Sequence, residues 1–437
     1  MSHVFYRRMG HSHPRAAWGE GALVWDDAGR RYVDACGGAV VVNVGHGVEA
    51  VARAMAGQAA AAAYVHPTVF TTEVLETYSA RLAPYVPLDD PCFYYVTSGS
   101  EGVEAAVKFA RQWQVARGEV GREVVIARWG SYHGATLGAL ALTGKPKMRR
   151  WFHGLFRDQP HVPPPYCYRC SFGAAYPACD LACAQALETE IRRHGAERVA
   201  AFIAEPVGGA TLGAVVPPAG YWARVREICD RYGVLLVADE VMTGFGRTGR
   251  WFGVEHFDVR PDVMVLGKGA TGGYFPLAIL AVRGTDAEAI RQVHGDFNHG
   301  GTFSHHAVGA AAANATLDCL EEGDLVRVAA ERGALLGQRL RAALEDVACV
   351  GDVRGLGMMW GVEFVACRET KAVFPPERHV GQAVCDAAFE RGVILYPGSG
   401  SVEGVAGDHL MVAPPFVITE AQIDEVVGVL REVVVQV

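Results

Sequence analysis

Two charged residues stand just after apolar runs of the sequence. A charge that is buried beside such a run needs either an interacting partner or a role in chemistry. Asp239 follows residues 234–238 (VLLVA), and Lys268 lies between two glycines after residues 263–266 (VMVL). A buried carboxylate is costly without a partner. Asp239 is therefore either a capping or ion-paired residue, or a carboxylate that keeps a heterocyclic nitrogen protonated. A desolvated lysine amine is a nucleophile, and the alternative for Lys268 is a surface residue in a flexible turn.

Two further segments have the residue types that bind an anion and a planar ring. Residues 97–101 (TSGSE) lie between an apolar run and a helical pattern. Backbone amides and the positive end of a helix favour an anion there, although an ordinary N-cap has the same composition. Residues 132–134 (YHG) carry an aromatic ring that either stacks on a planar ligand or packs in the core.

The segments that must position these residues alternate short apolar runs with helical patterns. This alternation favours an α/β fold with a mostly parallel sheet covered by helices on both faces. Such sheets bind ligands at the carboxyl ends of their strands, so the four polar segments are expected to meet at one edge. The predicted strands are residues 92–96, 123–127, 199–204, 234–238, 263–266 and 277–282. The predicted helices include residues 101–117 and 218–232, the second opened by Pro218 and closed by Gly233.

The two ends of the chain have a different pattern. A hairpin is predicted over residues 22–33, with its turn at 27–29. From about residue 325 a helix, strands and a helix are followed by a strand at 394–396 and a final helix from Glu420. We expect residues 1–55 and 326–437 to form one small α+β domain, and residues 56–325 to form the large ligand-binding domain.

Composition and charge restrict the class of protein. The chain has 437 residues, half of them hydrophobic, and a net charge of -8 without a basic block. A nucleic-acid partner is therefore not expected. The first ten residues lack the apolar run of a signal peptide, and no apolar run is long enough to span a membrane. The eleven cysteines fit reduced thiols. We expect a cytoplasmic protein without a membrane partner.

In their order and spacing the motifs resemble those of the class III (ω-amino-acid type) aminotransferases, pyridoxal-phosphate-dependent enzymes of fold type I. The resemblance runs from about residue 5 to the end of the chain. It implies pyridoxal 5'-phosphate as cofactor and a homodimer or homotetramer. The matching segments are TSGSEGVEAAVKFAR (97–111), SYHG (131–134), AEPVGG (204–209), LLVADEVMTGFGRTG (235–249), LGKGATGGYFPLA (266–278) and HGGTFSHHAVGAAAA (299–313), with GDVRGLGMMWGVEF and APPFVITEAQID near the C-terminus.

The resemblance implies that Lys268, Asp239 and Tyr132 are the catalytic residues. Lys268 would hold the cofactor as a Schiff base, and Asp239 would pair with its pyridine nitrogen. Tyr132 would cover one face of the ring and Val241 the other, with His133 adjacent.

The resemblance also implies how the rest of the cofactor is bound. Gly99 and Ser100 would bind the phosphate, and Glu205 would support hydrogen bonds near the ring hydroxyl. Thr302 would reach the phosphate of the neighbouring subunit's cofactor, so the active unit is expected to be at least a dimer.

The implied reaction moves an amino group from a primary amine or ω-amino acid to a 2-oxo acid, with pyruvate as the expected acceptor, through pyridoxamine phosphate. The ring would accept electrons, and the freed Lys268 amine would move the proton as general base and then acid. A lyase, decarboxylase or aminomutase needs the same lysine and aspartate and is the alternative. A regulator that only retains the fold is a third reading, but such proteins usually have an added DNA-binding segment, and none is visible here.

Two positions depart from the family pattern. Many ω-amino-acid transaminases have an arginine shortly before GDH…APP that pairs with the acceptor carboxylate, and the matching position here is Val405. Many also have a bulky aromatic before Asn43, where residues 40–42 are all valine. A shift of one or two residues in a loop is the alternative to a real substitution. If the arginine is absent, another cation must bind the carboxylate; Arg354 is a candidate, although the family often has an arginine there for structural reasons.

A cluster of cysteines follows the spacing C-x2-C-x8-C-x3-C. Four cysteines this close are able to hold structural zinc, but the gap between the pairs is short and the second pair is irregular. We therefore expect no metal site and four buried thiols, with zinc as the alternative. Histidines 11, 13, 305 and 306 lack ligand spacing and are expected to be structural. The cysteines are Cys167, Cys170, Cys179 and Cys183.

Overall fold

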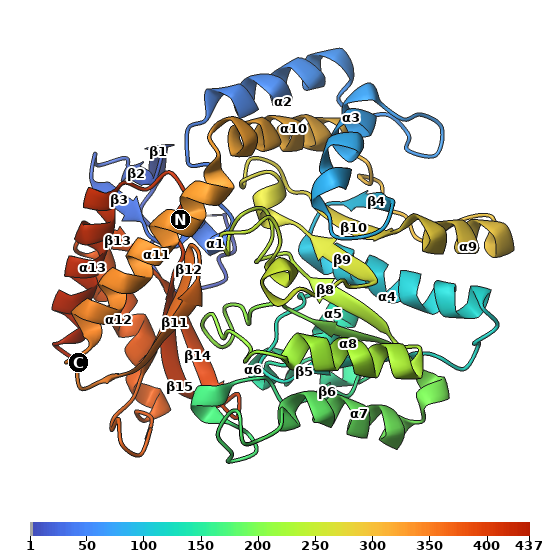
Figure 1. Cartoon of the computed structure of the whole chain (residues 1–437). Coiled ribbons are helices and arrows are strands. Elements are labelled where there is room, and N and C mark those ends of the chain that lie inside the picture. The colour runs from blue at the N-terminus through green and yellow to red at the C-terminus, as the bar shows by residue number, and fades with distance from the viewer. Residues whose placement is uncertain (1–2) are drawn as a thin grey trace.

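A seven-stranded sheet lies at the centre of the larger part of the molecule in the computed structural model, which describes residues 3–437 (Figure 1). Strand β10 runs antiparallel to both of its neighbours, and all other neighbouring strands are parallel. The expected α/β fold with a mostly parallel sheet is confirmed. In spatial order the strands are β4 (Pro91–Val96), β10 (Ala278–Arg283), β9 (Val263–Leu266), β8 (Leu235–Asp239), β7 (Val199–Ala204), β5 (Val124–Arg128) and β6 (His161–Val162).

Both faces of this sheet are buried, which explains why its strands are almost continuously apolar. Successive side chains of a strand point to opposite faces. In β8, Leu235 and Val237 pack in the cluster formed with α4 (Gly99–Ala116), α5 (Leu137–Leu142) and α9 (Gly284–His294). Leu236 and Ala238 pack in the opposite cluster, which includes α7 (Ala182–His194) and α8 (Tyr221–Tyr232).

The start of one helix and the end of another are determined by a capping residue in the sequence. The Ser98 hydroxyl caps α4 by accepting a hydrogen bond from the Glu101 amide, which satisfies a donor that the first helical turn leaves free. Gly233 ends α8 at a φ of 64°, as expected. The start of that helix was predicted wrongly: Pro218 does not open it. The helix begins at Tyr221, because Gly220 at a φ of 78° turns the chain first.

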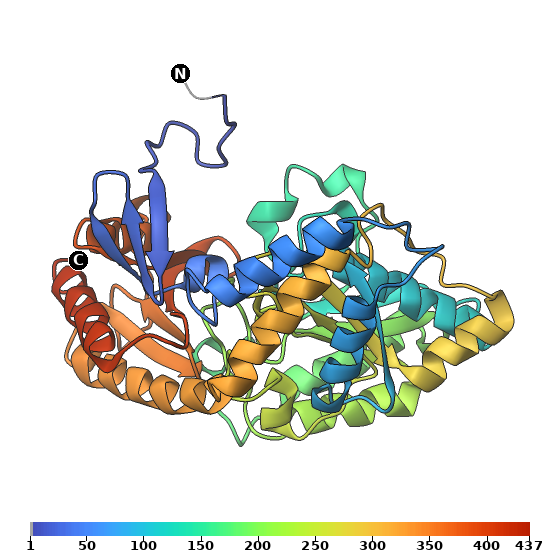
Figure 2. The same cartoon turned by 90° about the horizontal axis from the view of Figure 1, so that it is seen from above.

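The smaller part of the molecule joins both ends of the chain. Strand β3 pairs in parallel with β13, so blue and red segments lie side by side in Figures 1 and 2. The predicted hairpin is formed by β2 and β3, and β1 adds a strand that was not predicted. One sheet contains β1 (Ala16–Glu20), β2 (Leu23–Asp26), β3 (Arg31–Asp34) and β13 (Val393–Ile394); the other contains β11 (Val350–Leu356), β12 (Met359–Phe364), β15 (Ala406–Val412) and β14 (Tyr396–Val402).

Three helices belong to this smaller part: α11 (Leu325–Leu344), α12 (Val380–Phe389) and α13 (Glu420–Val434), the last beginning at Glu420 as predicted. The predicted boundary near residue 325 coincides with the start of α11. The boundary at residue 55 falls inside α2 (Glu49–Ala62), which packs on α10 (Ala307–Glu322) next to α3 (Glu73–Leu82) (Figure 1). The division into residues 1–55, 56–325 and 326–437 remains a prediction.

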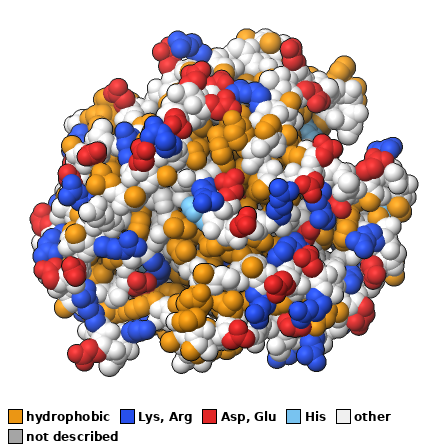
Figure 3. All heavy atoms as spheres, viewed as in Figure 1, with side chains coloured by type: hydrophobic (Ala, Val, Ile, Leu, Met, Phe, Trp, Pro, Cys, Tyr) orange, Lys and Arg blue, Asp and Glu red, His pale blue; other side chains and the backbone are white. Residues whose placement is uncertain are grey.

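Acidic and basic side chains are interspersed over the face shown in Figure 3. Within residues 3–437 no helix is both long enough and apolar enough to cross a membrane. Two short helices, α1 (Gly37–Val40) and α6 (Pro146–Arg149), lie between longer elements.

Candidate active site

The carboxyl ends of five strands bring most of the predicted site residues to one edge of the central sheet. Strand β4 runs in the same direction as β9, because each is antiparallel to β10. The loops after these strands therefore open on the same side, as expected for ligand binding in such sheets. The residues are Gly99 and Ser100 after β4, Tyr132 and His133 after β5, Glu205 after β7, Asp239 and Val241 at and after β8, and Lys268 after β9.

Lys268 has the properties of a reactive amine. It follows β9 after Gly267 and adopts a φ of 43°, a left-handed conformation that a non-glycine residue adopts at a cost and that is common at functional sites. Burial lowers the pKa of its amine to about 8, and Arg247 acts in the same direction, while Asp239 and Glu205 oppose the shift. An amine with this pKa is partly neutral near pH 8 and therefore nucleophilic.

Asp239 is held by a buried histidine. Its Oδ2 lies 2.7 Å from His133 Nδ1, and its Oδ1 accepts a hydrogen bond from the Val241 amide at 3.1 Å. His133 Nε2 is buried and has no hydrogen-bond partner within residues 3–437. The sequence placed His133 next to the ring, but its contact with Asp239 was not predicted.

Glu205 positions the backbone that carries Tyr132. Its Oε1 accepts hydrogen bonds from the Tyr132 amide at 3.2 Å and the Gly209 amide at 3.4 Å, and its Oε2 lies 3.5 Å from Arg128 Nη2. Burial raises the pKa of Glu205 above its ordinary value. The Tyr132 side chain remains partly open, with 39% of its surface exposed.

The start of α4 forms a cradle of small residues. A Cβ on Gly99 would lie 3.0 Å from Val241 Cγ1, and a Cβ on Gly134 would lie 2.6 Å from Ser100 Oγ. Gly134 also has a φ of 141°, so glycine is needed there for both space and conformation. Ser100 Oγ accepts a hydrogen bond from the Ala135 amide at 3.0 Å and so joins this turn to the helix.

These residues fit pyridoxal phosphate. The amine of Lys268 has no hydrogen bond or ion pair within the described part of the chain, and Asp239 and Glu205 lie close enough to influence its charge. The glycine cradle at the amino end of an 18-residue helix suits a phosphate. Amine, carboxylate and anion cradle are the groups that this cofactor requires.

Thr302 is exposed in the segment between α9 and α10. Within residues 3–437 it forms no hydrogen bond with Lys268 or Asp239. Its predicted role toward a neighbouring subunit therefore remains a prediction.

The two departures from the family pattern differ in their surroundings. Val405 is 73% exposed at the tip of the β14–β15 hairpin, whereas residues 40 and 42 are buried. Arg354 Nη1 lies 2.8 Å from both Asp352 and Glu363, and its Nη2 donates to the Leu212 carbonyl. Because its guanidinium is neutralised by two carboxylates, Arg354 has a structural role and is a poor candidate for substrate binding.

Among residues 3–437 no group of three or more His, Cys, Asp or Glu side chains is arranged to hold an ion, and the expectation that the cysteine cluster binds no metal remains a prediction. The expectation of four buried thiols is wrong, because Cys167 is exposed and the other three are only half-buried. Burial raises the pKa of Cys183 to about 11.

His306 packs against Phe275, with ring centroids 5.0 Å apart, as a structural histidine would.

Two residues beside the site were not predicted. The Arg247 guanidinium donates hydrogen bonds to the carbonyls of Val42, Met358, Ala413 and Pro414. Asn43 donates to the Gly269 carbonyl at 3.0 Å and the Phe245 carbonyl at 3.3 Å. Asn43 ties the N-terminal segment to the loop of Lys268, whereas Arg247 ties the loop after β8 to segments from both ends of the chain. The run GFGRTG, an arginine in a small-residue loop after Asp239, is the sequence signal for Arg247.

Comparisons with known proteins agree with this geometry. Residues 7–434 match the model of the aminotransferase class-III family. The aminotransferase YodT of Bacillus subtilis is 37% identical over 99% of this chain and 97% of its own length. The putrescine–pyruvate aminotransferase of Pseudomonas aeruginosa is 34% identical over 94% of this chain and 88% of its own. The (S)-enantioselective ω-transaminase of Thermomicrobium roseum has a similar structure, with a TM-score of 0.89 and 37% identity over 98% of this chain and 93% of its own.

The expected resemblance is therefore confirmed over nearly the whole chain. Fold type I is confirmed as well, since the matching structures are transaminases of that fold. The chain belongs to the class III aminotransferase family and is a pyridoxal-5'-phosphate-dependent transaminase that uses an amine donor and a 2-oxo acid acceptor.

Proposed function

We propose that this transaminase moves an amino group from a primary amine or ω-amino acid to a 2-oxo acid, with pyruvate as the preferred acceptor. The observation that carries the proposal is the half-buried Lys268, which lies close enough to Asp239 to feel its charge and whose amine has its pKa lowered by burial to about 8. The names of two similar proteins support the substrate classes, one a putrescine–pyruvate aminotransferase and the other an ω-transaminase.

Each residue of the site would have a separate role in the reaction. Bound pyridoxal phosphate supplies an electron-accepting ring and keeps the transferred amino group as pyridoxamine phosphate between the two half-reactions. Asp239, oriented by His133, would hold the proton on the ring nitrogen. Lys268 would remove the proton from the substrate Cα and deliver it to the C4′ carbon of the cofactor. Tyr132 and Val241 would confine the ring.

The phosphate would lie at the start of α4, where Gly99 and Ser100 offer backbone amides and Ser100 a hydroxyl. Glu205 would fix the loop of Tyr132 through its amide. We further propose that Thr302 completes the site of a neighbouring subunit, so that the active unit is a homodimer or homotetramer. A cytoplasmic location fits the cysteines, which are all free thiols in the structure.

The test is a screen of amine donors against pyruvate with holoenzyme. We expect alanine to form in the same amount as the aldehyde or ketone derived from the donor, and no product beyond one turnover without an acceptor. The same screen with 2-oxoglutarate measures acceptor preference. Continuous release of carbon dioxide or ammonia without any acceptor would overturn aminotransfer in favour of a decarboxylase or lyase.

A further inference from the structure

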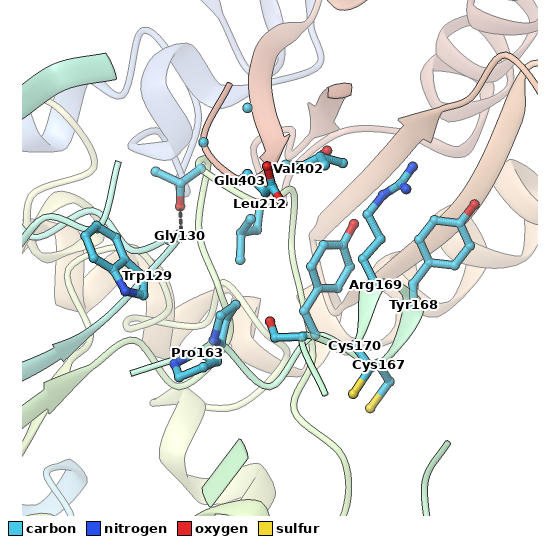
Figure 4. Close-up of a pocket in the computed structure, with 18 of the residues that line it drawn as sticks. Trp129, Gly130, Pro163, Cys167, Tyr168, Arg169, Cys170, Leu212, Val402 and Glu403 are labelled. Carbon is cyan, nitrogen blue, oxygen red and sulfur yellow. Dashed lines mark hydrogen bonds between the residues drawn. The ribbon is translucent and has the colours of Figure 1, made fainter. Parts of the chain in front are cut away.

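A cavity of about 970 Å³ lies beside the catalytic residues (Figure 4). In Figure 4, Trp129 and Gly130 lie on one side of it, and Tyr168 and Arg169 lie on the other. The β14–β15 hairpin contributes Glu403 and its neighbours to the lining. Lys268 and Asp239 do not line the cavity, but Gly130 leads within two residues to Tyr132, so this side of the cavity adjoins the site.

Four charged side chains line the cavity. They differ in whether an oppositely charged group or a hydrogen-bond partner contacts them. Arg169 pairs with Glu363. Lys371 Nζ donates to the Tyr168 carbonyl at 2.7 Å and lies over the Tyr168 ring, on the side away from Gly130. The ammonium group of Lys145 has no hydrogen bond or ion pair with any described residue.

Glu403 is the carboxylate among the described lining residues, and it forms no ion pair with Lys145 in the structure. Glu403 is exposed, whereas Lys145 is half-buried. A half-buried ammonium group that faces a cavity without a counter-ion favours an anionic ligand.

The backbone holds Lys145 next to the loop of Tyr132. The preceding residue, Gly144, accepts a hydrogen bond from the Gly130 amide at 2.8 Å and donates one to the Ser131 carbonyl at 3.1 Å. A Cβ on Gly144 would lie 2.1 Å from the Arg128 carbonyl oxygen, so only glycine permits this approach. Lys145 is thereby fixed at the catalytic side of the cavity.

A second cation lies nearby. Arg7 is exposed, and its charge acts on Lys145, Tyr132 and Tyr396, lowering the pKa of each while burial raises that of the two tyrosines. Burial lowers the pKa of Lys145, and Lys147 and Arg7 lower it further. No carboxylate of residues 3–437 forms an ion pair with the Lys145 ammonium group, so its positive charge has no direct counter-ion.

We propose that Lys145, assisted by Arg7, binds the carboxylate of the 2-oxo acid acceptor. These residues would take the place of the arginine that the family pattern leads one to expect at Val405, whose exposed side chain offers no charge. The proposal rests on the proposed aminotransferase function and names the part of that site that selects carboxylate-bearing acceptors.

The test compares Lys145→Met with wild-type holoenzyme on pyruvate and on pyruvamide, a neutral acceptor of nearly the same shape. We expect the KM for pyruvate to rise by about tenfold to a hundredfold, which corresponds to the loss of a hydrogen bond to a charged group. The KM for pyruvamide and the rate of the half-reaction with an uncharged-tail donor such as 1-phenylethylamine should not change. Lys145→Arg should restore most of the affinity for pyruvate.

Two further variants provide a second test and a control. Arg7→Met changes an exposed residue, so folding is not at risk, and it should also raise the KM for pyruvate selectively. Lys371→Met removes a cation from the far side of the same cavity and should behave as wild type. Unchanged KM for pyruvate in both Lys145→Met and Arg7→Met would overturn the proposal, whereas wild-type enzyme that fails to form alanine from pyruvate would instead overturn the proposed function.

Discussion

Replacing Lys268 by methionine separates the energetic effect of burying this amine from its chemical role. The side chain keeps nearly the same length and loses its charge. We expect turnover to be abolished and the apo-protein to become more stable at pH 7. Catalysis and stability therefore change in opposite directions, as expected where a site is arranged for function rather than for stability.

The magnitude follows from the pKa. Burial lowers it from 10.5 to about 8, and one pH unit corresponds to about 1.4 kcal/mol. Keeping the amine charged in the folded protein therefore costs about 3 kcal/mol below pH 8. Between pH 8 and 10.5 the unfolded chain binds the proton and the folded protein does not, so the stability of the wild type rises with pH. The advantage of Lys268→Met should shrink over that interval.

The assay is urea unfolding of cofactor-free protein at pH 7 and pH 9.5, at one protein concentration because assembly also contributes to stability. Lys147→Met, a change at an exposed lysine, is the control and should alter the free energy of unfolding by less than about 0.5 kcal/mol. If Lys268→Met were less stable than wild type at pH 7, or if its advantage were the same at both pH values, the amine would not be a buried charge.

Asp239→Asn should retain the fold but slow the half-reaction with a good amine donor by about 100-fold or more, because an amide stabilises a ring cation poorly; a wild-type rate in stopped-flow absorbance would remove Asp239 from its role. Thr302→Ala should weaken cofactor retention by about 1–3 kcal/mol in equilibrium dialysis, and sedimentation should show a dimer or larger species; a fully active monomer would contradict the shared site. Protein purified without added zinc should contain well below about one equivalent of metal per chain by elemental analysis. Stoichiometric zinc that is lost in Cys167→Ser would show that the cysteines do bind an ion.

The sequence predicted all strands of the central sheet except β6 to within one residue at each end, because fully buried strands form short apolar runs bounded by polar residues. Residues 234–238 were predicted, for example, and β8 spans Leu235–Asp239. The direction of β10 was not predictable, since a strand buried on both faces has the same apolar pattern whether it runs parallel or antiparallel. The two-residue strand β6 is too short to produce any pattern.

The site was less predictable than the sheet. Motif order located Lys268, Asp239 and Glu205, which the structure brings together at one edge. The contact of His133 with Asp239 depends on how the loop after β5 folds back, and no local pattern encodes that path. The same reason applies to Lys145, which stands in a loop of ordinary composition and comes close to Tyr132 only through the hydrogen bonds of Gly144.

The pairing of β3 with β13 affects how the chain matures during translation. Asp34 and Ile394 form a pair across 360 residues, and at about 5–20 residues per second the ribosome needs about 20 to 70 s to supply the second partner. Through that time the hairpin of β2 and β3 has an open edge, a template for mispairing. The guanidinium of Arg247 also lacks two hydrogen-bond acceptors until the carbonyls of Ala413 and Pro414 have been synthesised. A nascent chain released before residue 393 would have an unpaired β3 edge and a buried Arg247 guanidinium that lacks two of its carbonyl partners, so cofactor loading should follow completed synthesis.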